Sequence, residues 1–184
     1  RQADAILTIT APPGSSLIEG VPIGAWWPRP GGTFDDDSRR ELRDTIASAI
    51  HTGPERTAAQ DVAFGLRQLT DVTAKALSPG INDPTTAVQV LDELHRILRV
   101  AGSRADRSPH LVDADGTVRV LDLPTTFARL LDLSLDEIAH YGKDSLQVPR
   151  RIDTLLDDLW GSVRDEHGAA VTAKRTALQD ALGA

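Results

Sequence analysis

One short stretch, Ser78–Ala87, holds residues whose types and spacing could do chemistry. Asp83 followed by Pro84 is typical of a helix N-cap and its first helical position. The free amides of such a helix start, together with nearby hydroxyl groups, could bind an anion or a carbonyl group. The same residues also have structural uses, because a capping carboxylate competes with an anion and Gly80 can supply a positive φ. Both interpretations are open, and the structural one is favoured because every residue has a local role.

A second group of polar residues precedes this loop on an expected helix. Arg67 and Asp71 are four residues apart, so they face each other on one side of that helix. Arg67 and Gln68 stand beside core positions, and we expect at least one of them to point toward the loop at Asn82. There it would hold loop carbonyls or bind a carboxylate or phosphate group of a ligand. The candidate ligand-binding residues are therefore Arg56, Asp61, Arg67, Gln68, Ser78, Asn82, Asp83 and Thr85.

Metal and catalytic sites have weaker support. The five histidines include no pair three or four residues apart, and the chain has no cysteine, so the common helical and thiolate zinc patterns are absent. His140 lies four residues after Asp136, which predicts a surface pair. Asp113–Gly116 starts like a calcium loop but lacks its later ligands, which favours a hairpin turn. No nucleophile elbow or glycine-rich phosphate loop occurs, so we expect no metal and no cofactor, and the sequence leans against an enzyme.

Composition limits the class of protein. The 184 residues carry a formal net charge of -7, which argues against a nucleic-acid surface. A composition with 40% hydrophobic and 26% charged residues is typical of a folded protein, and the length suits one domain, 1–184. No apolar run approaches the roughly 20 residues of a membrane span, and the chain starts at Arg1 without a signal peptide. We interpret it as a fragment of a longer protein.

The elements that must position these residues begin with short strands. Residues 6–10 alternate like a strand, and 17–18 and 21–26 predict further strands before a Pro- and Gly-rich linker. Trp26 and Trp27 are adjacent, so their side chains would point to opposite faces of a strand. We expect one tryptophan to be buried and the other to lie at an interface.

Helices dominate residues 35–184, which follow the β-rich segment 1–32, so the fold class is α+β with a mostly helical bundle. Apolar residues at helical spacing mark each helix, with Val62 and Val72 among those expected to be buried. Two of the helices should form an antiparallel pair around the loop. We expect helices starting at Asp35, about Thr57 and Pro84, a β-hairpin at about 110–121 with Asp115–Gly116 at its turn, and three later helices, the last after Gly168.

Two motifs in the chain resemble the signature of a known family. Asp61–Asp71, with the sequence DVAFGLRQLTD, and Ala76–Ala87, with the sequence ALSPGINDPTTA, are similar to domain of unknown function 2254, a bacterial family of predicted membrane proteins. The resemblance covers most of the chain and weakens after about Gly142. It implies transmembrane helices ahead of Arg1, a soluble C-terminal part that this chain represents, and no assigned activity. It also implies membrane association, with the cytoplasm as the expected side.

Two functional hypotheses follow from these observations. The first is a non-enzymatic assembly or regulatory module that forms a homo-oligomer and is tethered to the membrane helices. The alternative is small-molecule binding, by a sensor or an enzyme, at the polar site around Ser78–Ala87. Polar groups that converge on an open pocket would favour the alternative, whereas polar groups closed on one another would favour the first hypothesis.

Overall fold

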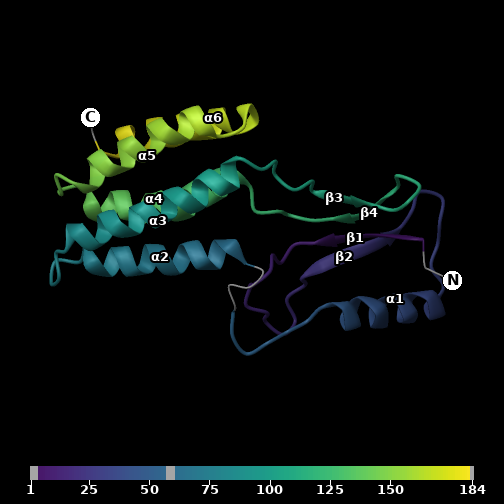
Figure 1. Ribbon diagram of the computed structural model, residues 1–184. Helices are drawn as coiled ribbons and strands as arrows, with labels where there is room; N and C mark the ends of the chain where they lie inside the picture. The colour runs from purple at the N-terminus through teal and green to yellow at the C-terminus, as the bar shows by residue number, and fades with distance from the viewer. Residues whose placement is uncertain (1–3, 57–60, 183–184) are drawn as a thin grey trace. The chain divides into compact units, whose positions relative to one another are not determined.

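The chain forms two compact units. The computed structural model describes residues 4–56 and 61–182. Arg1–Thr57 and Ser108–Pro124 form one unit, named here the sheet unit, and Ala58–Arg107 and Thr125–Ala184 form the other, the bundle unit (Figure 1). The architecture is α+β and mostly helical, as predicted. That both units fold together as one domain stays a prediction.

In the part of the sheet unit that the structure describes, four strands form a sheet in the order β2-β1-β4-β3. β1 (Ala5–Ile9) pairs antiparallel with β2 (Gly24–Pro28) on one side and parallel with β4 (Val118–Leu121) on the other. β3 (His110–Val112) pairs antiparallel with β4 and completes the predicted hairpin. The hairpin therefore extends the sheet of the N-terminal strands, although about a hundred residues separate them in the chain.

The turn of the hairpin is closed by its own side chains. Asp113 Oδ1 accepts the amide of Thr117 at 2.9 Å, and Gly116 takes a φ of 76° in the left-handed region. Arg119 donates through Nε to Asp113 Oδ2 at 2.6 Å and also hydrogen-bonds Asp4, just before β1. The bond from Arg119, followed by the Thr117 amide, holds the pKa of Asp113 below its usual range. These contacts account for Asp113 and join the turn to the neighbouring strand.

Two of the expected strand segments differ from the structure. Residues 17–18 form no strand, because the Val21 amide donates to the Ile18 carbonyl at 3.0 Å and Gly20 has a φ of 80°, which together make a turn. β2 begins at Gly24 rather than at residue 21. A Cβ at Gly24 would lie 2.2 Å from the carbonyl oxygen of Thr8, so the close approach of β2 to β1 requires glycine there.

The helix of the sheet unit, α1 (Asp36–Ala49), begins where the sequence predicts. Asp35 caps it by accepting the Ser38 amide at 2.8 Å. Its larger apolar residues, Leu42 and Ile46, are only half-buried, and no described residue of the sheet unit is fully buried. Trp26 is half-buried and Trp27 is 38% exposed, so the prediction of one buried tryptophan was wrong.

The described residues of the bundle unit form five helices: α2 (Val62–Ala76), α3 (Pro84–Gly102), α4 (Phe127–Gly142), α5 (Val148–Ser162) and α6 (Asp165–Leu182) (Figure 1). α2 and α3 form the predicted antiparallel pair, and α3 also packs against α4 and α5. This unit holds the hydrophobic core. Its largest fully buried side chains are Leu66, Leu91, Leu94, Leu98, Phe127, Leu131, Leu135, Ile138, Val148, Leu155, Leu156 and Leu159.

α2 differs from the sequence-based expectation in its start and in its buried face. It begins at Val62, and residues 57–60 of the expected helix lie outside the described residues. Val62 and Val72 are exposed, contrary to the prediction. Thr70 and Thr73 are buried instead, because Thr70 Oγ1 donates to the Leu133 carbonyl at 3.0 Å and Thr73 Oγ1 bonds within its own helix. Satisfied hydroxyl groups can occupy a core where a hydropathy pattern would place valine.

The last helix also starts earlier than the sequence analysis predicts. α6 begins at Asp165, and Gly168 lies inside it rather than before it. A Cβ at Gly168 would lie 3.6 Å from the ring of Trp160, an ordinary packing distance. This glycine therefore lies beside the Trp160 ring of α5 within a continuous helix.

Candidate functional site

The Ser78–Ala87 loop is a tight, hydrogen-bonded turn between α2 and α3. The amides of Ile81 and Asn82 both donate to the carbonyl of Ser78, at 3.0 and 2.9 Å. Asn82 has a φ of 48°, so asparagine occupies the left-handed position that the sequence analysis assigned to Gly80. Asparagine is among the few residues that tolerate this conformation.

Asp83 caps α3 with both of its carboxylate oxygens. Oδ1 accepts the amides of Thr85 and Thr86 at 3.1 Å each, and Oδ2 accepts the Thr86 hydroxyl at 2.5 Å. These bonds, with the Thr86 hydroxyl first, hold the pKa of Asp83 below its usual range. The Ser78 hydroxyl donates to the Lys75 carbonyl at 2.7 Å. The carboxylate therefore occupies the helix N-terminus at which an anion would bind.

Arg67 lies on α2 between two carboxylates. Its Nε pairs with Asp71 at 2.8 Å, which confirms the predicted pair, and its two terminal nitrogens bond Glu137 of α4 at 2.5 and 3.2 Å. The Glu137 hydrogen bond is the main cause that raises the pKa of Arg67. Arg67 precedes the end of α2 by nine residues, roughly 14 Å along the axis, so it joins α2 to α4 and not to the loop. Gln68 is exposed.

The remaining predicted residues lie at different places. Asp61 caps the start of α2 by accepting the Phe64 amide at 3.0 Å. The 15-residue helix separates it from Ser78 by roughly 22 Å. Arg56 is exposed and belongs to the sheet unit. The structure thus brings together the loop residues, and separately Arg67 with its partners, but not the eight residues in one pocket. Ligand binding at any of them stays a prediction.

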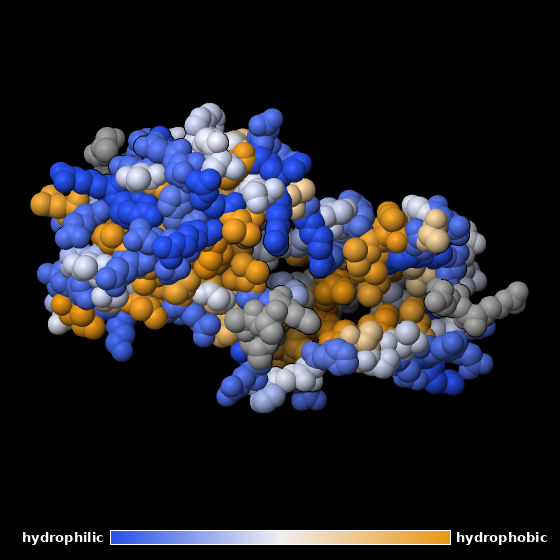
Figure 2. Space-filling model, viewed as in Figure 1, coloured by the Kyte–Doolittle hydropathy of each residue, from blue (hydrophilic) through white to orange (hydrophobic). Residues whose placement is uncertain are grey.

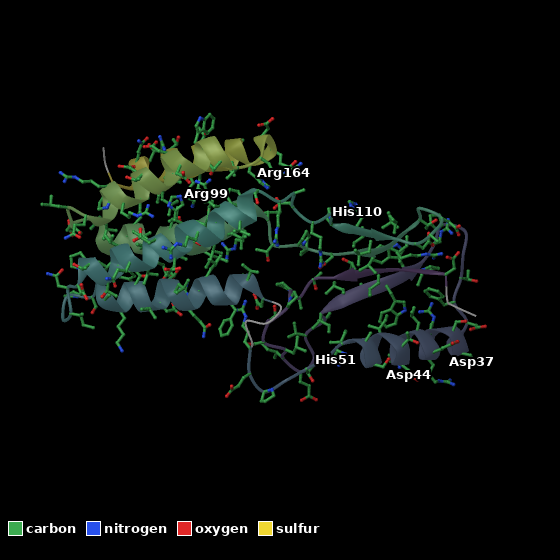
Figure 3. The ribbon with its side chains drawn as sticks, in the orientation of Figure 1. Asp37, Asp44, His51, Arg99, His110 and Arg164 are labelled. Atoms are coloured by element: carbon green, nitrogen blue, oxygen red, sulfur yellow. The ribbon has the colours of Figure 1, made fainter. Side chains whose placement is uncertain are left out.

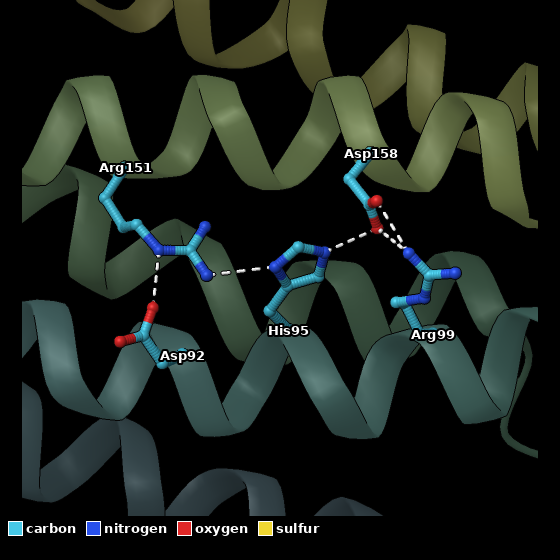
Figure 4. A network of polar contacts seen from close by, with 5 residues as sticks. All are labelled: Asp92, His95, Arg99, Arg151 and Asp158. Atoms are coloured by element: carbon cyan, nitrogen blue, oxygen red, sulfur yellow. Dashed lines mark hydrogen bonds and ion pairs between the residues drawn. The ribbon is translucent and has the colours of Figure 1, made fainter.

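A larger polar network joins α3 to α5, and the sequence analysis missed it (Figure 4). Arg151 donates through Nε to Asp92 at 2.7 Å and through a terminal nitrogen to His95 Nδ1 at 2.9 Å. His95 Nε2 and Asp158 are 2.7 Å apart. Asp158 also accepts two bonds from Arg99, at 2.6 and 2.7 Å.

The partners of His95 determine its tautomer. A guanidinium group can only donate, so His95 Nδ1 accepts from Arg151 and the ring proton lies on Nε2, which donates to Asp158. The His95 bond, with the pair from Arg99 after it, holds the pKa of Asp158 below its usual range. Because both ring nitrogens are engaged, His95 in this arrangement has no nitrogen left to take a proton from a substrate. The network therefore holds α3 and α5 together, and it is named here the clamp.

A sequence signal for this network exists in the spacing of its members. Asp92, His95 and Arg99 recur at three and four residues on α3, beside its apolar face, and Arg151 and Asp158 are seven apart on α5. Each set forms one polar stripe along a helix. The spacing does not indicate that the two stripes face each other.

Two further buried polar residues, both on α6, have partners from distant parts of the chain. Lys174 of α6 is 8% exposed and pairs with Asp132 at 2.5 Å and Asp136 at 2.6 Å, both on α4. Burial lowers the pKa of Lys174, but the two carboxylates raise it by more, so it lies above its usual value. Asp136 is thus taken by Lys174, and the predicted pair with His140 was wrong. His167 is buried and donates through Nε2 to a backbone carbonyl.

The histidines do not gather into a metal site. His51 lies just beyond α1 and His110 on β3, both labelled in Figure 3 in the sheet unit. Within residues 4–56 and 61–182, no group of three or more histidine and acidic side chains could hold a metal ion. A groove of about 260 Å³ lies between α4, α5 and α6, and none of the predicted ligand residues lines it. Its lining residues are Ala139, Pro149, Ile152, Asp153, Leu156, Arg175, Leu178 and Gln179.

Comparison with known families agrees with the motifs on α2 and at the loop. The model of domain of unknown function 2254, described as a predicted membrane protein, matches residues 1–158. The chain belongs to this family. The family's description carries no activity, so it adds no reaction to the geometry above.

The curated relatives are much longer than this chain. Uncharacterised proteins of Mycobacterium bovis and of two strains of Mycobacterium tuberculosis are 36% identical to it over 132 residues, which cover 70% of this chain and 24% of each relative. The match thus spans about a quarter of their length. No solved structure matches the chain. Among the helices that the structure describes, none is long and apolar enough to cross a bilayer.

Proposed function

We propose that this part of the protein is a non-enzymatic assembly module of a membrane protein, in which the sheet unit associates with a second copy. The observation that carries this proposal is the absence of any fully buried residue in the described part of the sheet unit, residues 4–56 and 108–124. A sheet needs a covered apolar face to be stable. Burial of that face by a second copy would supply the missing core.

One face of the sheet is almost continuously apolar. The strand register places Leu7 opposite both Trp26 and Val120, and residues directly opposite each other point to the same face. Leu111 of β3 lies opposite Val120, extends this face to the sheet edge and is 46% exposed. Figure 2 displays apolar surface over the strands of this unit.

The one helix in the described part of the sheet unit cannot cover both faces of its sheet. Among its described residues α1 is the one helix, so it can cover at most one face. Trp27, opposite Ile6 on the other face, is also exposed. Closed association of identical surfaces is the commonest form of protein assembly, which favours a second copy as the cover.

The polar residues support a non-enzymatic role. Asp83 is used by the cap of α3, Arg67 by two carboxylates, and His95 by Arg151 and Asp158. These groups are closed on one another and do not converge on the groove between α4, α5 and α6. This arrangement supports the first hypothesis of the sequence analysis over ligand binding at the loop.

Light scattering coupled to size-exclusion chromatography tests the proposal on this chain and on the full-length protein in detergent. We expect oligomers whose proportion rises with concentration. Leu111→Lys should shift the population toward monomer, because it places a charge on the apolar face. Val72→Lys, at an exposed position of α2 in the bundle unit, is the matched control and should leave the mass unchanged. Monomers alone in both preparations would refute assembly.

A further inference from the structure

One end of the helical bundle exposes three large apolar side chains on two neighbouring connections. Ile81 in the α2–α3 turn is 53% exposed, Tyr141 at the end of α4 is 51% exposed, and Leu146 in the α4–α5 connection is 78% exposed. The two connections lie side by side, because a Cβ at Gly142 would be 3.3 Å from the Leu77 side chain (Figure 1). Leu146 has the largest exposed fraction among the large hydrophobic residues of the described chain.

These apolar side chains stand on preformed turns. The turn around Ile81 is closed by two amides on one carbonyl and by the cap at Asp83. In the α4–α5 connection, the Ser145 amide donates to the Gly142 carbonyl at 3.0 Å, and the Ser145 hydroxyl accepts the Gln147 amide at 3.2 Å. The exposure is therefore built into hydrogen-bonded structure. A group of exposed apolar side chains rimmed by polar residues is typical of an interaction surface.

Ile81, Tyr141 and Leu146 are named here the apolar tips. The charges around them fit an anionic surface. Lys75, Lys143 and Arg150 are exposed at this end of the bundle. The carboxylates on the same two turns are Asp83, which accepts the amides of the α3 start, and Asp144. Three cations against two carboxylates leave these turns with a small positive charge, opposite in sign to the -7 of the whole chain.

The geometry points to a bilayer-docking surface at this end of the bundle, with anionic lipid headgroups as its ligand. Ile81 and Leu146 would enter the apolar edge of the bilayer, and Tyr141 would lie at headgroup level, where its ring and hydroxyl are both satisfied. Lys75 and Lys143 would contact lipid phosphates. Apolar tips beside basic residues are the usual composition of surfaces that lie on membranes. The family's membrane association makes a bilayer a nearby partner, and the inference does not depend on assembly through the sheet unit.

Flotation with lipid vesicles tests this surface on the 184-residue chain. The chain should float with vesicles of phosphatidylcholine mixed with phosphatidylglycerol, more weakly with phosphatidylcholine alone, and less as salt is added. The double variant Ile81→Asp/Leu146→Asp should lower binding at least about tenfold. The matched control is Val72→Asp/Val100→Asp, two positions 53% and 54% exposed on the helices α2 and α3, which should float like the wild type.

Three results would overturn the inference. The first is a wild-type chain that floats with neither vesicle, and the second is an equal loss of binding in the tip and control variants. The third is a tip variant that breaks up an oligomer in light scattering while no form of the chain floats, which would assign the tips to a second copy. Unchanged circular dichroism of each variant establishes that it folds. Leu111→Lys should float normally, which separates this test from that of assembly.

Discussion

Replacement of Gly142 by alanine probes the close approach of α4 to α5 at the loop end of the bundle. A Cβ at this position would lie 2.4 Å from Val148 Cγ1 and 2.9 Å from Val148 Cβ, both shorter than real contacts allow. Val148 is completely buried, so it cannot turn into solvent to make room. Overpacking of this kind costs about 1–3 kcal/mol. Alanine returns at most about 1 kcal/mol of helix propensity, so the net loss in the free energy of unfolding should be about 1–2 kcal/mol.

The same substitution at Gly161 of α5 is the matched control. Nothing lies within 4 Å of a Cβ built there, so Gly161→Ala should raise the free energy of unfolding by about 0.5–1 kcal/mol. Urea unfolding followed by circular dichroism gives both values, provided that the slopes of the transitions agree. If Gly142→Ala proves as stable as Gly161→Ala, the approach of α4 to α5 is looser than the distances state and the reasoning fails.

Three more outcomes are expected. Lys174→Met should lower the free energy of unfolding by about 1–2 kcal/mol near neutral pH, since two half-exposed carboxylates lose their buried cation. The pKa of Lys174 is raised in the fold, so this contribution should be complete below about pH 10 and vanish as pH rises through the folded value, which urea titrations on both sides can check. Asp83→Ala should lower the thermal midpoint of unfolding at neutral pH but not at strongly acidic pH. Because the pKa of Asp83 is lowered in the fold, its cap stabilises the protein above about pH 4, and this contribution is lost as the pH falls through the folded pKa. Nitrogen NMR shifts should report His95 with its proton on Nε2 at alkaline pH, and a proton on Nδ1 would contradict the bond from Arg151.

Short-range chemistry was predictable in this chain. The cap at Asp83, the Arg67–Asp71 pair and the hairpin turn at Asp113 all join residues within four positions of each other. Such contacts depend on residue type and spacing, both of which a sequence contains. The assignment of positive φ to Gly80 failed for a local reason, because Asn82 tolerates the same conformation.

Long-range pairing was not predictable from one sequence. The parallel contact of β1 with β4 joins Leu7 to Val120, and Arg151 meets Asp92 across 59 positions. Many alternative pairings share the same periodicity, and the choice among them depends on how all the elements pack together. For this reason the clamp at His95 was missed, although its spacing along each helix was visible.

The sequence by itself determined the α+β class, the membership in a membrane-protein family and the corner at Ser78–Ala87, because these depend on composition, motif and local capping. Only the tertiary structure decided that Arg67 faces Glu137, that His95 is held by both nitrogens, and that the sheet unit has no buried core in its described residues. The physical reason is that exclusion of solvent and the partners of long side chains are properties of packed surfaces. Those surfaces form only when distant segments pack together. The exposure of the apolar tips at Ile81 and Leu146 results from the same packing.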